Sequence, residues 1–222
     1  MRQIIPFGYC IGVDHIDYDF KHLRKEKDFT LNTMQAMRSS APTRCVVDHE
    51  NMNGEQFAKK YLRILEKHPR LRDLIESRFN MFMYRIHNFD YKFKITTSWI
   101  VELNDGDQIQ PHNHNNCYYS GILYYGERYP NGSTELILRN PIEDTMRNVF
   151  PKVEDNLNHM KNDFPVIPET GALYFWPSQI IHYSAPHQGE PRYSLPFNLV
   201  PTHPMYCGDS AQNLAWITNQ NS

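Results

Sequence analysis

The hydrophobic pattern of the chain changes once, near Asn88. Over residues 54–87, apolar side chains recur every three or four positions, as expected for amphipathic helices that bury one face. Pro69 interrupts this pattern. Because proline lacks a backbone N–H and restricts the residue before it, we expect it to divide the segment into two helices. Residues 17–38 are charged and irregular, so we expect only a short helix or an arm with helical parts there.

After Asn88 the chain consists of short runs rich in β-branched and aromatic residues, separated by Gly, Asn, Asp and Pro. Residues 140–165 break this rhythm because they are polar and contain few core residues, so we expect a surface loop or lid there. The remaining runs predict strands at 94–103, 108–112, 118–125, 135–138, 172–175, 180–183 and 192–199.

Helices followed by strands indicate an α+β protein in which the helices buttress one face of a largely antiparallel sheet or sandwich. A length of 222 residues fits one domain. We therefore expect a single domain over residues 1–222. Its predicted parts are a mostly helical segment at 1–90, a sheet core at 91–200 that contains the 140–165 insertion, and a C-terminal tail at 201–222.

Composition and charge narrow the function classes only slightly. The formal net charge is -2 and no basic stripe is present, so we do not expect a nucleic-acid partner. The four cysteines lie far apart without C-x-x-C spacing, which favours reduced thiols over a zinc knuckle or a disulfide framework. No apolar run is long enough for a signal peptide or a bilayer span, so we expect a soluble cytoplasmic protein without a membrane partner.

The candidate chemistry begins with His112 and His114. Two residues apart on a strand, their side chains point to the same face and can hold one metal ion if a third ligand reaches them. His182 lies at the end of a second apolar stretch that delivers its imidazole into the interior. Neutral imidazole is a good ligand for Fe(II), and three imidazoles on one side leave positions open opposite them for a cosubstrate and dioxygen.

A candidate anion site follows ten residues later, at Arg192. Strand alternation places positions 192, 194, 196 and 198 on one face. A buried guanidinium on that face is suited to bind a dicarboxylate in bidentate geometry, with the Ser194 hydroxyl as a second donor.

From about Thr96 to Asn198, the chain resembles the Fe(II)- and 2-oxoglutarate-dependent dioxygenases, which fold as a double-stranded β-helix, or jelly roll. It is similar to their prolyl-hydroxylase-like branch. It is closer still to a group of 2-oxoglutarate oxygenases that is common in bacterial and phage genomes, where a phage-encoded member would act in the host cytoplasm. The matching motifs are His112-x-His114, Ser120-Gly121, Tyr124-Tyr125, Phe175-Trp176-Pro177-Ser178, His182, and Arg192 to Asn198.

This resemblance implies a jelly-roll core at 91–200 with Fe(II) held by the three histidines, and 2-oxoglutarate and O2 as cosubstrates. The implied reaction converts 2-oxoglutarate to succinate and CO2 while a substrate is hydroxylated. The resemblance points to a small molecule or a peptide or protein side chain as the substrate, without identifying it, and the sequence does not indicate the oligomeric state. Arg192 would pair the distal carboxylate of 2-oxoglutarate, and the other residues implied in the cosubstrate pocket are Ser194, Tyr125, Tyr119 and Asn198.

His114 stands where the wider family usually has a carboxylate ligand, and three arrangements follow. The site can be a three-histidine triad, the third ligand can come from an acidic residue nearby, or the iron can carry two protein ligands and an anion. We favour the triad because His114 has the family's spacing. The acidic alternatives are Asp105, Asp107 and Glu135.

Two other functions fit parts of the same pattern. A cupin-type dioxygenase would use a three-histidine iron without 2-oxoglutarate, and Arg192 would then bind the substrate's own carboxylate. A non-catalytic jelly-roll binding module would have kept its metal for structure or lost it. We also expect at least two of the four tyrosines in the 118–125 run to serve cross-strand packing, because only the inward half of a strand can face the site.

Overall fold

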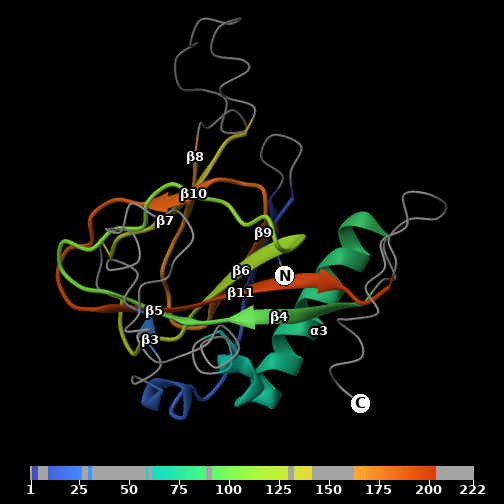
Figure 1. Cartoon of the computed structure of the whole chain (residues 1–222), viewed down its shortest axis with the longest axis horizontal. Coiled ribbons are helices and arrows are strands. Elements are labelled where there is room, and N and C mark those ends of the chain that lie inside the picture. The colour runs from blue at the N-terminus through green and yellow to red at the C-terminus, as the bar shows by residue number, and fades with distance from the viewer. Residues whose placement is uncertain are drawn as a thin grey trace, which may run out of the picture.

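The computed structural model describes residues 2–4, 10–26, 30–31, 59, 62–88, 92–129, 133–141 and 163–203. They form an eight-stranded and a three-stranded sheet (Figure 1). The large sheet contains β1 (Arg2–Ile4), β2 (Ile11–His15), β3 (Thr30–Leu31), β4 (Phe93–Ser98), β5 (Ile100–Leu103), β6 (Tyr119–Tyr124), β9 (Ala172–Pro177) and β11 (Arg192–Pro201). The small sheet contains β7 (Leu136–Arg139), β8 (Asp163–Val166) and β10 (His182–Ser184).

The long strand β11 organises the large sheet, whose order is β1-β2-β9-β6-β11-β5-β3. One edge of β11 pairs with β6, and the other pairs first with β5 and then with β4. All these pairs are antiparallel, and only the short β3 runs parallel to its neighbour β5. The small sheet has the order β10-β7-β8 and is antiparallel throughout.

Within the described residues one long helix, α3 (Pro69–His87), covers one face of the large sheet (Figure 1). Pro69 lies in its first turn, where a missing N–H costs no helical hydrogen bond, and Asn88 ends it in the left-handed conformation with φ of 52°. The helix packs Leu71, Ile75 and Phe79 against the sheet. Aromatic rings of the sheet surround Phe79, with ring centroids 5.1 Å away at Phe93, Tyr119 and Phe175.

The small sheet covers the opposite face of the large sheet. A second apolar cluster joins Leu136, Leu138 and Val166 of the small sheet to Ile122 and Tyr124 of β6. Side chains therefore alternate along β6 between the helix on one side and the second sheet on the other. This two-sheet core, with its helix on the outer face, confirms the predicted α+β jelly roll.

Several element predictions were wrong in detail. Residues 108–112 do not form a strand, and only His112 makes an isolated bridge, to His182. The predicted strand at 94–103 is interrupted at Trp99 and forms β4 and β5. The predicted mostly helical 1–90 segment also supplies β1, β2 and β3. Strand β2 was missed because Gly12 interrupts its apolar pattern. A Cβ at that position would lie 2.8 Å from the Phe175 ring.

The predicted insertion at 140–165 is too long at its C-terminal end, because β8 begins at Asp163 and pairs with β7. Residues 142–162 and 204–222 lie outside the described part of the chain, as do 54–58 and 60–61 of the predicted upstream helix and 27–29 and 32–38 of the 17–38 segment. Short 3-10 turns occur at Leu23–Lys25 and Ile64–Glu66. Among the residues described, no helix combines the length and apolarity needed to cross a membrane.

Candidate metal centre

The three predicted histidines meet on one side of the small sheet. His182 begins β10, and the other two lie in the irregular 108–117 segment that runs beside it. Backbone hydrogen bonds hold this segment in place. The N–H of His112 donates to the carbonyl of His182 at 3.1 Å, and the N–H of His182 donates back to the carbonyl of His112 at 2.8 Å. The N–H of His114 donates to the carbonyl of Ser178 at 3.0 Å.

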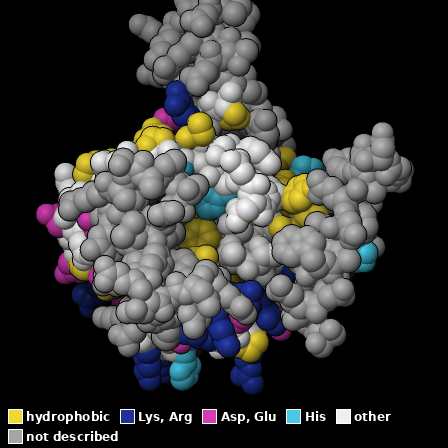
Figure 2. Space-filling view, in the orientation of Figure 1, with side chains coloured by type: hydrophobic (Ala, Val, Ile, Leu, Met, Phe, Trp, Pro, Cys, Tyr) yellow, Lys and Arg dark blue, Asp and Glu magenta, His cyan; other side chains and the backbone are white. Residues whose placement is uncertain are grey.

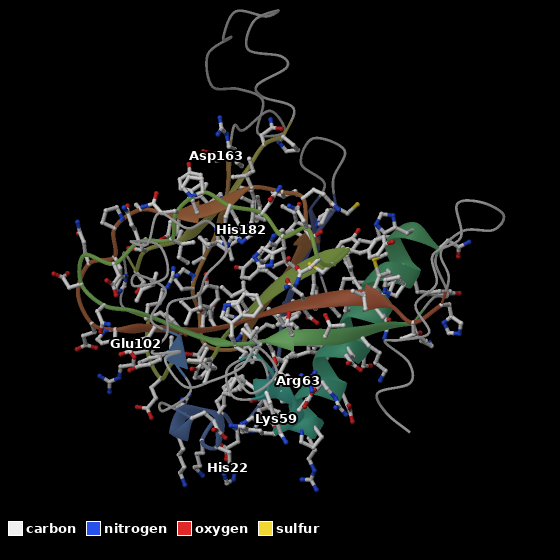
Figure 3. The ribbon with its side chains drawn as sticks, in the orientation of Figure 1. His22, Lys59, Arg63, Glu102, Asp163 and His182 are labelled. Carbon is white, nitrogen blue, oxygen red and sulfur yellow. The ribbon has the colours of Figure 1, made fainter. Side chains whose placement is uncertain are left out.

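The ligand nitrogens of His112, His114 and His182 all lie within 4.8 Å of one another. Since metal–imidazole bonds are about 2.1 Å long, small side-chain rotations bring all three nitrogens to one ion. Figure 3 shows His182 near the middle of the molecule, and Figure 2 shows histidine atoms reaching the surface near the centre of the same face. Of the three residues, His182 is buried, His114 half-buried and His112 exposed, so the cluster is open at the His112 end.

Each imidazole has its Nδ1 next to a hydrogen-bond acceptor. For His112 the acceptor is the carbonyl of Gln110 at 2.8 Å, and for His182 it is the carbonyl of Ile180 at 3.1 Å. For His114 it is the side-chain oxygen of Asn198 at 2.8 Å. Carbonyl oxygens only accept, so the proton of each neutral ring lies on Nδ1. The three Nε2 lone pairs remain available to a metal ion.

Burial keeps the three imidazoles neutral. It lowers the pKa of His182 to about 3, with a further lowering from the nearby His112. It lowers the pKa of His114 to about 4, where His112 acts in the same direction and the Asn198 hydrogen bond opposes it. The pKa of His112 is also lowered by burial, against the effect of its hydrogen bond to Gln110. Neutral imidazole is the metal-binding form, so the cluster is ready to coordinate an ion at neutral pH.

No carboxylate joins the histidine group within the described residues. Asp105 and Asp107 instead stabilise turns, because Asp105 accepts a hydrogen bond from the Gly189 N–H and Asp107 accepts one from the Asn104 N–H. Of the three arrangements left open by the sequence, the three-histidine set agrees best with this geometry.

The predicted anion site forms one compact cluster on the inner face of the large sheet. Arg192 is 1% exposed, its Nη1 donates to the backbone oxygen of Thr134, and its Nε and Nη2 are buried without a partner among the described residues. Ser194 is fully buried, and its hydroxyl is likewise unpartnered there. Tyr124 lies directly opposite Ser194 in the strand register, and its buried hydroxyl also has no partner in this part of the chain. The guanidinium carbon lies 5.7 Å from the centroid of the Tyr124 ring.

Unpaired buried polar groups are costly, and an unpaired buried guanidinium especially so. A cluster of a guanidinium and two hydroxyls is suited to bind an anion with several oxygens. Asn198, next to His114, and Ser194 are four residues apart on β11, which is about 13 Å at 3.3 Å per residue. The anion cluster and the histidine cluster are thus two ends of one inner face.

Tyr119 and Tyr125, which were predicted to line the cosubstrate pocket, lie on the helix side of the large sheet. Tyr119 faces α3, where its hydroxyl contacts His87 Nε2 at 3.2 Å. Tyr125 also belongs to the helix-side core and lines a separate pocket of about 600 Å³ with Arg24 and Tyr193. The structure brings Asn198 to the histidines, not to the anion cluster.

The sequence placed Tyr124 and Trp176 in matching motifs but did not predict that they lie beside the site. The Trp176 ring packs edge-on against His182 with centroids 5.3 Å apart, and its buried Nε1 is without a partner in the described region. Alternation along β6 could have paired Ser120 with Tyr124 on one face, in place of Tyr119 with Tyr125. The missing information was which face of β6 points inward.

One comparison with known proteins covers the segment that contains this site. Residues 97–198 match the model of a family described as "Putative 2OG-Fe(II) oxygenase". No curated protein sequence matches the chain significantly.

Similar solved structures include a 2OG-Fe(II) oxygenase family oxidoreductase from Burkholderia pseudomallei, at 13% identity and a TM-score of 0.43. That match covers 59% of this chain and 55% of the other, so this chain spans about half the length of that protein. A prolyl-4-hydroxylase from Pseudomonas putida is 15% identical, with 85% of each chain covered and a TM-score of 0.44. HygX from Streptomyces hygroscopicus, solved with nickel and 2-oxoglutarate, is 10% identical, with 86% and 82% covered and a TM-score of 0.45.

With TM-scores below 0.5, these likenesses do not bear on the chemistry of this chain. The family match does, because it spans the residues that build the site: the three histidines, Tyr124, Arg192, Ser194 and Asn198. Over residues 97–198, the segment that holds all of these side chains, this chain is similar to the family of 2OG-Fe(II) oxygenases.

Proposed function

We propose that this protein is an Fe(II)- and 2-oxoglutarate-dependent oxygenase that hydroxylates a small molecule or a peptide side chain. The observation that carries the proposal is the combination, on one inner face, of three neutral imidazoles with a buried guanidinium whose Nε and Nη2 have no partner among the described residues. When bound, Fe(II) and 2-oxoglutarate together supply the O2 chemistry that oxidises the substrate and releases succinate and CO2.

His112, His114 and His182 would hold the iron through their Nε2 atoms. The donor set fits, because each Nδ1 proton already has an acceptor and each ring is kept neutral by burial. Three imidazoles on one side of an ion leave the opposite positions open to other ligands. The three rings thus fix the position of the ion and leave its other face to the reactants.

Arg192, Ser194 and Tyr124 would hold the distal carboxylate of 2-oxoglutarate. The carboxylate would give acceptors to the unpaired Nε and Nη2 of Arg192 and to the two hydroxyls. The surrounding apolar cluster, including Leu103, Leu136 and Val166, excludes water and so strengthens these charge-assisted bonds. The cosubstrate would then lie between the anion cluster and the histidines.

The test is succinate release by the Fe(II)-loaded protein given 2-oxoglutarate and O2. We expect His182→Ala and Arg192→Ala each to reduce the rate at least about 100-fold, because one removes a ligand and the other the anion partner. His203→Ala is the matched control, since this exposed histidine lies outside the site and should leave the rate unchanged.

Calorimetry under anaerobic conditions separates the two ends of the site. The Mn(II)-loaded Arg192→Ala protein should keep its metal affinity and lose 2-oxoglutarate binding. Succinate release that neither substitution affects would end the proposal. Oxygen consumption without succinate would reassign the site to a three-histidine dioxygenase that does not use 2-oxoglutarate.

A further inference from the structure

His114 differs from the other two histidines in how its ring is held. His112 and His182 each bond through Nδ1 to the backbone carbonyl two residues earlier, so their orientation is built into the local chain. The Nδ1 of His114 bonds to a side chain, that of Asn198 on β11. His114 lies in an irregular segment, so its ring orientation depends on a residue 84 positions away.

Asn198 is buried beside His114 and is itself held by a second side chain. Its side chain is 3% exposed, and it lies at the point where the register of β11 against β4 shifts. Its neighbour across the strand pair is Ser120 of β6, whose hydroxyl donates to Asn198 Oδ1 at 3.1 Å. The same oxygen accepts the His114 Nδ1–H at 2.8 Å.

The hydrogen bonds that lead from Cys117 through Ser120 to Asn198 all donate toward Asn198 Oδ1. Burial raises the pKa of the Cys117 thiol, which therefore stays protonated and can donate to the Ser120 hydroxyl 3.7 Å away. The Ser120 hydroxyl then donates its own proton to Asn198 Oδ1. Two donors at one oxygen fix the amide in this orientation. A reversed amide would instead donate to Nδ1 of His114 and force the ring proton onto Nε2, where it would block metal binding.

The plane of the His114 ring has a second support. Trp99, at the break between β4 and β5, stacks on it with centroids 5.7 Å apart and an interplanar angle of 23°. Trp99 restricts the tilt of the ring, but an apolar face cannot choose between the two ring nitrogens. The hydrogen bond at Nδ1 therefore decides which nitrogen of His114 carries the proton.

We propose that Asn198 is a positioning residue that makes Nε2 of His114 the metal-binding atom, and that Ser120 holds the Asn198 amide in the orientation this requires. The inference rests on the proposed metal site. It explains how an imidazole serves at the position where the wider family has a carboxylate. It also removes Asn198 from the candidate contacts to the cosubstrate.

Anaerobic titration with Co(II), followed by the visible absorbance of the bound ion, tests this proposal without turnover. Asn198→Leu keeps the approximate size of the side chain and removes the acceptor, and we expect it to weaken Co(II) binding about 10- to 100-fold. Asn198→Asp keeps an acceptor oxygen and should bind at least as tightly as the natural protein. Asn113→Ala, an exposed amide beside the same ligands, is the control and should change the affinity less than threefold.

Proton NMR of the Co(II)-loaded protein reports the bond directly. Three exchangeable imidazole N–H signals, shifted by the ion, are expected in the natural protein. In Asn198→Leu the signal of His114 should be lost to solvent exchange, while those of His112 and His182 remain because their acceptors are backbone atoms. A merely structural role for Asn198 would leave all three signals in place.

Each outcome decides a separate point. Co(II) affinity within threefold of the natural protein in Asn198→Leu overturns the role of Asn198 and leaves the proposed function intact. If that variant does not fold, a tenfold loss of affinity in Asn198→Asp overturns the role equally. Failure of the natural protein to bind Co(II) at all would overturn both this inference and the proposed function.

Discussion

The side chain of Arg192 lies in an environment that is unfavourable for the stability of the ligand-free protein. It is 1% exposed, only its Nη1 has a hydrogen-bond partner within the described residues, and its guanidinium carbon lies 5.7 Å from the centroid of the Tyr124 ring. Leaving a charge buried and unpaired costs several kcal/mol in proteins. A ligand carboxylate would remove that cost, which agrees with the proposed role of Arg192 in binding 2-oxoglutarate.

The buried charge of Arg192 predicts that a substitution at this residue can raise stability while it removes 2-oxoglutarate binding. Arg192→Met replaces the unpaired charge with an apolar chain of similar length. We expect the free energy of unfolding of the ligand-free protein to rise by about 1–3 kcal/mol, and 2-oxoglutarate binding to the Mn(II)-loaded protein to be lost. Urea unfolding measures the first effect and calorimetry the second.

Arg192→Lys is the matched control for that substitution. It keeps the charge and removes the planar fork, so it should weaken 2-oxoglutarate binding without the gain in stability. A Met variant that is less stable than the natural protein by more than about 1 kcal/mol would contradict this explanation of Arg192.

At the scale of elements, the site depends on packing that occurs on the other side of the large sheet. Helix α3 packs on the outer face of this sheet, where Phe79 is fully buried among Phe93, Tyr119 and Phe175. The inner face of the same sheet carries Tyr124, Ser194 and Asn198. Stability and chemistry are therefore divided between the two faces of one set of strands.

Phe79→Ala should lower the stability of the fold without changing the metal affinity of the site. Loss of the ring from a closely packed aromatic cluster is expected to lower the free energy of unfolding by about 3–5 kcal/mol. Co(II) affinity should change little in the fraction that stays folded, because the histidines lie on the opposite side of the sheet. Chemical denaturation and Co(II) titration measure the two effects.

Tyr84→Ala on the same helix is the control, since this side chain is 59% exposed and its loss should cost less than about 0.5 kcal/mol. Equal destabilisation by the two substitutions would show that α3 does not pack as described.

For the whole molecule, the histidine cluster links metal binding to folding. The three ligands come from the irregular 108–117 segment and from β10, which are close together only in the folded chain. An ion that binds only the folded state stabilises it, by about 2.7 kcal/mol when its concentration is a hundred times the dissociation constant.

We therefore expect Mn(II) to raise the thermal unfolding temperature at neutral pH, and a chelator to reverse the rise. His182→Ala should abolish the effect, while His203→Ala should retain it. Differential scanning calorimetry with and without the ion gives the measurement. A rise of equal size in the His182→Ala protein would place the binding site elsewhere.

The same cluster makes the metal-free protein sensitive to acid. Burial lowers the pKa of His114 and His182 to about 4 and about 3, from 6.5 in the unfolded chain. Above 6.5 the rings are neutral in both states and do not oppose folding. Below it the unfolded chain takes up protons that the folded chain does not, so the free energy of unfolding falls as the pH drops from 6.5 toward the folded pKa values.

Urea unfolding of the metal-free protein at several pH values between about 7 and about 5 measures this dependence. The His182→Ala protein should show a shallower fall, since one of the depressed groups is gone. Stability that stays constant or increases on acidification over this range would contradict the burial of neutral imidazoles.

The sequence alone determined the local features of the protein. Periodicity located the helix that begins at Pro69, and alternation placed Arg192, Ser194 and Asn198 on one face of β11. Residue chemistry selected His112, His114 and His182 as one metal-binding set. The helix and the shared strand face are confirmed because both depend on near neighbours in the chain, whereas the metal-binding role of the three histidines, which come from distant segments, stays a prediction.

The tertiary structure decided which residues meet. Both faces of the large sheet are buried, one under α3 and the other under the small sheet, so hydrophobicity along β6 cannot tell which face points to the site. Tyr124 was therefore missed in favour of Tyr125. His112 and His114 share the site through backbone bonds to His182 and Ser178, not through the strand alternation that first suggested it. Such contacts depend on pairing between distant segments, and no local pattern in the chain encodes that pairing.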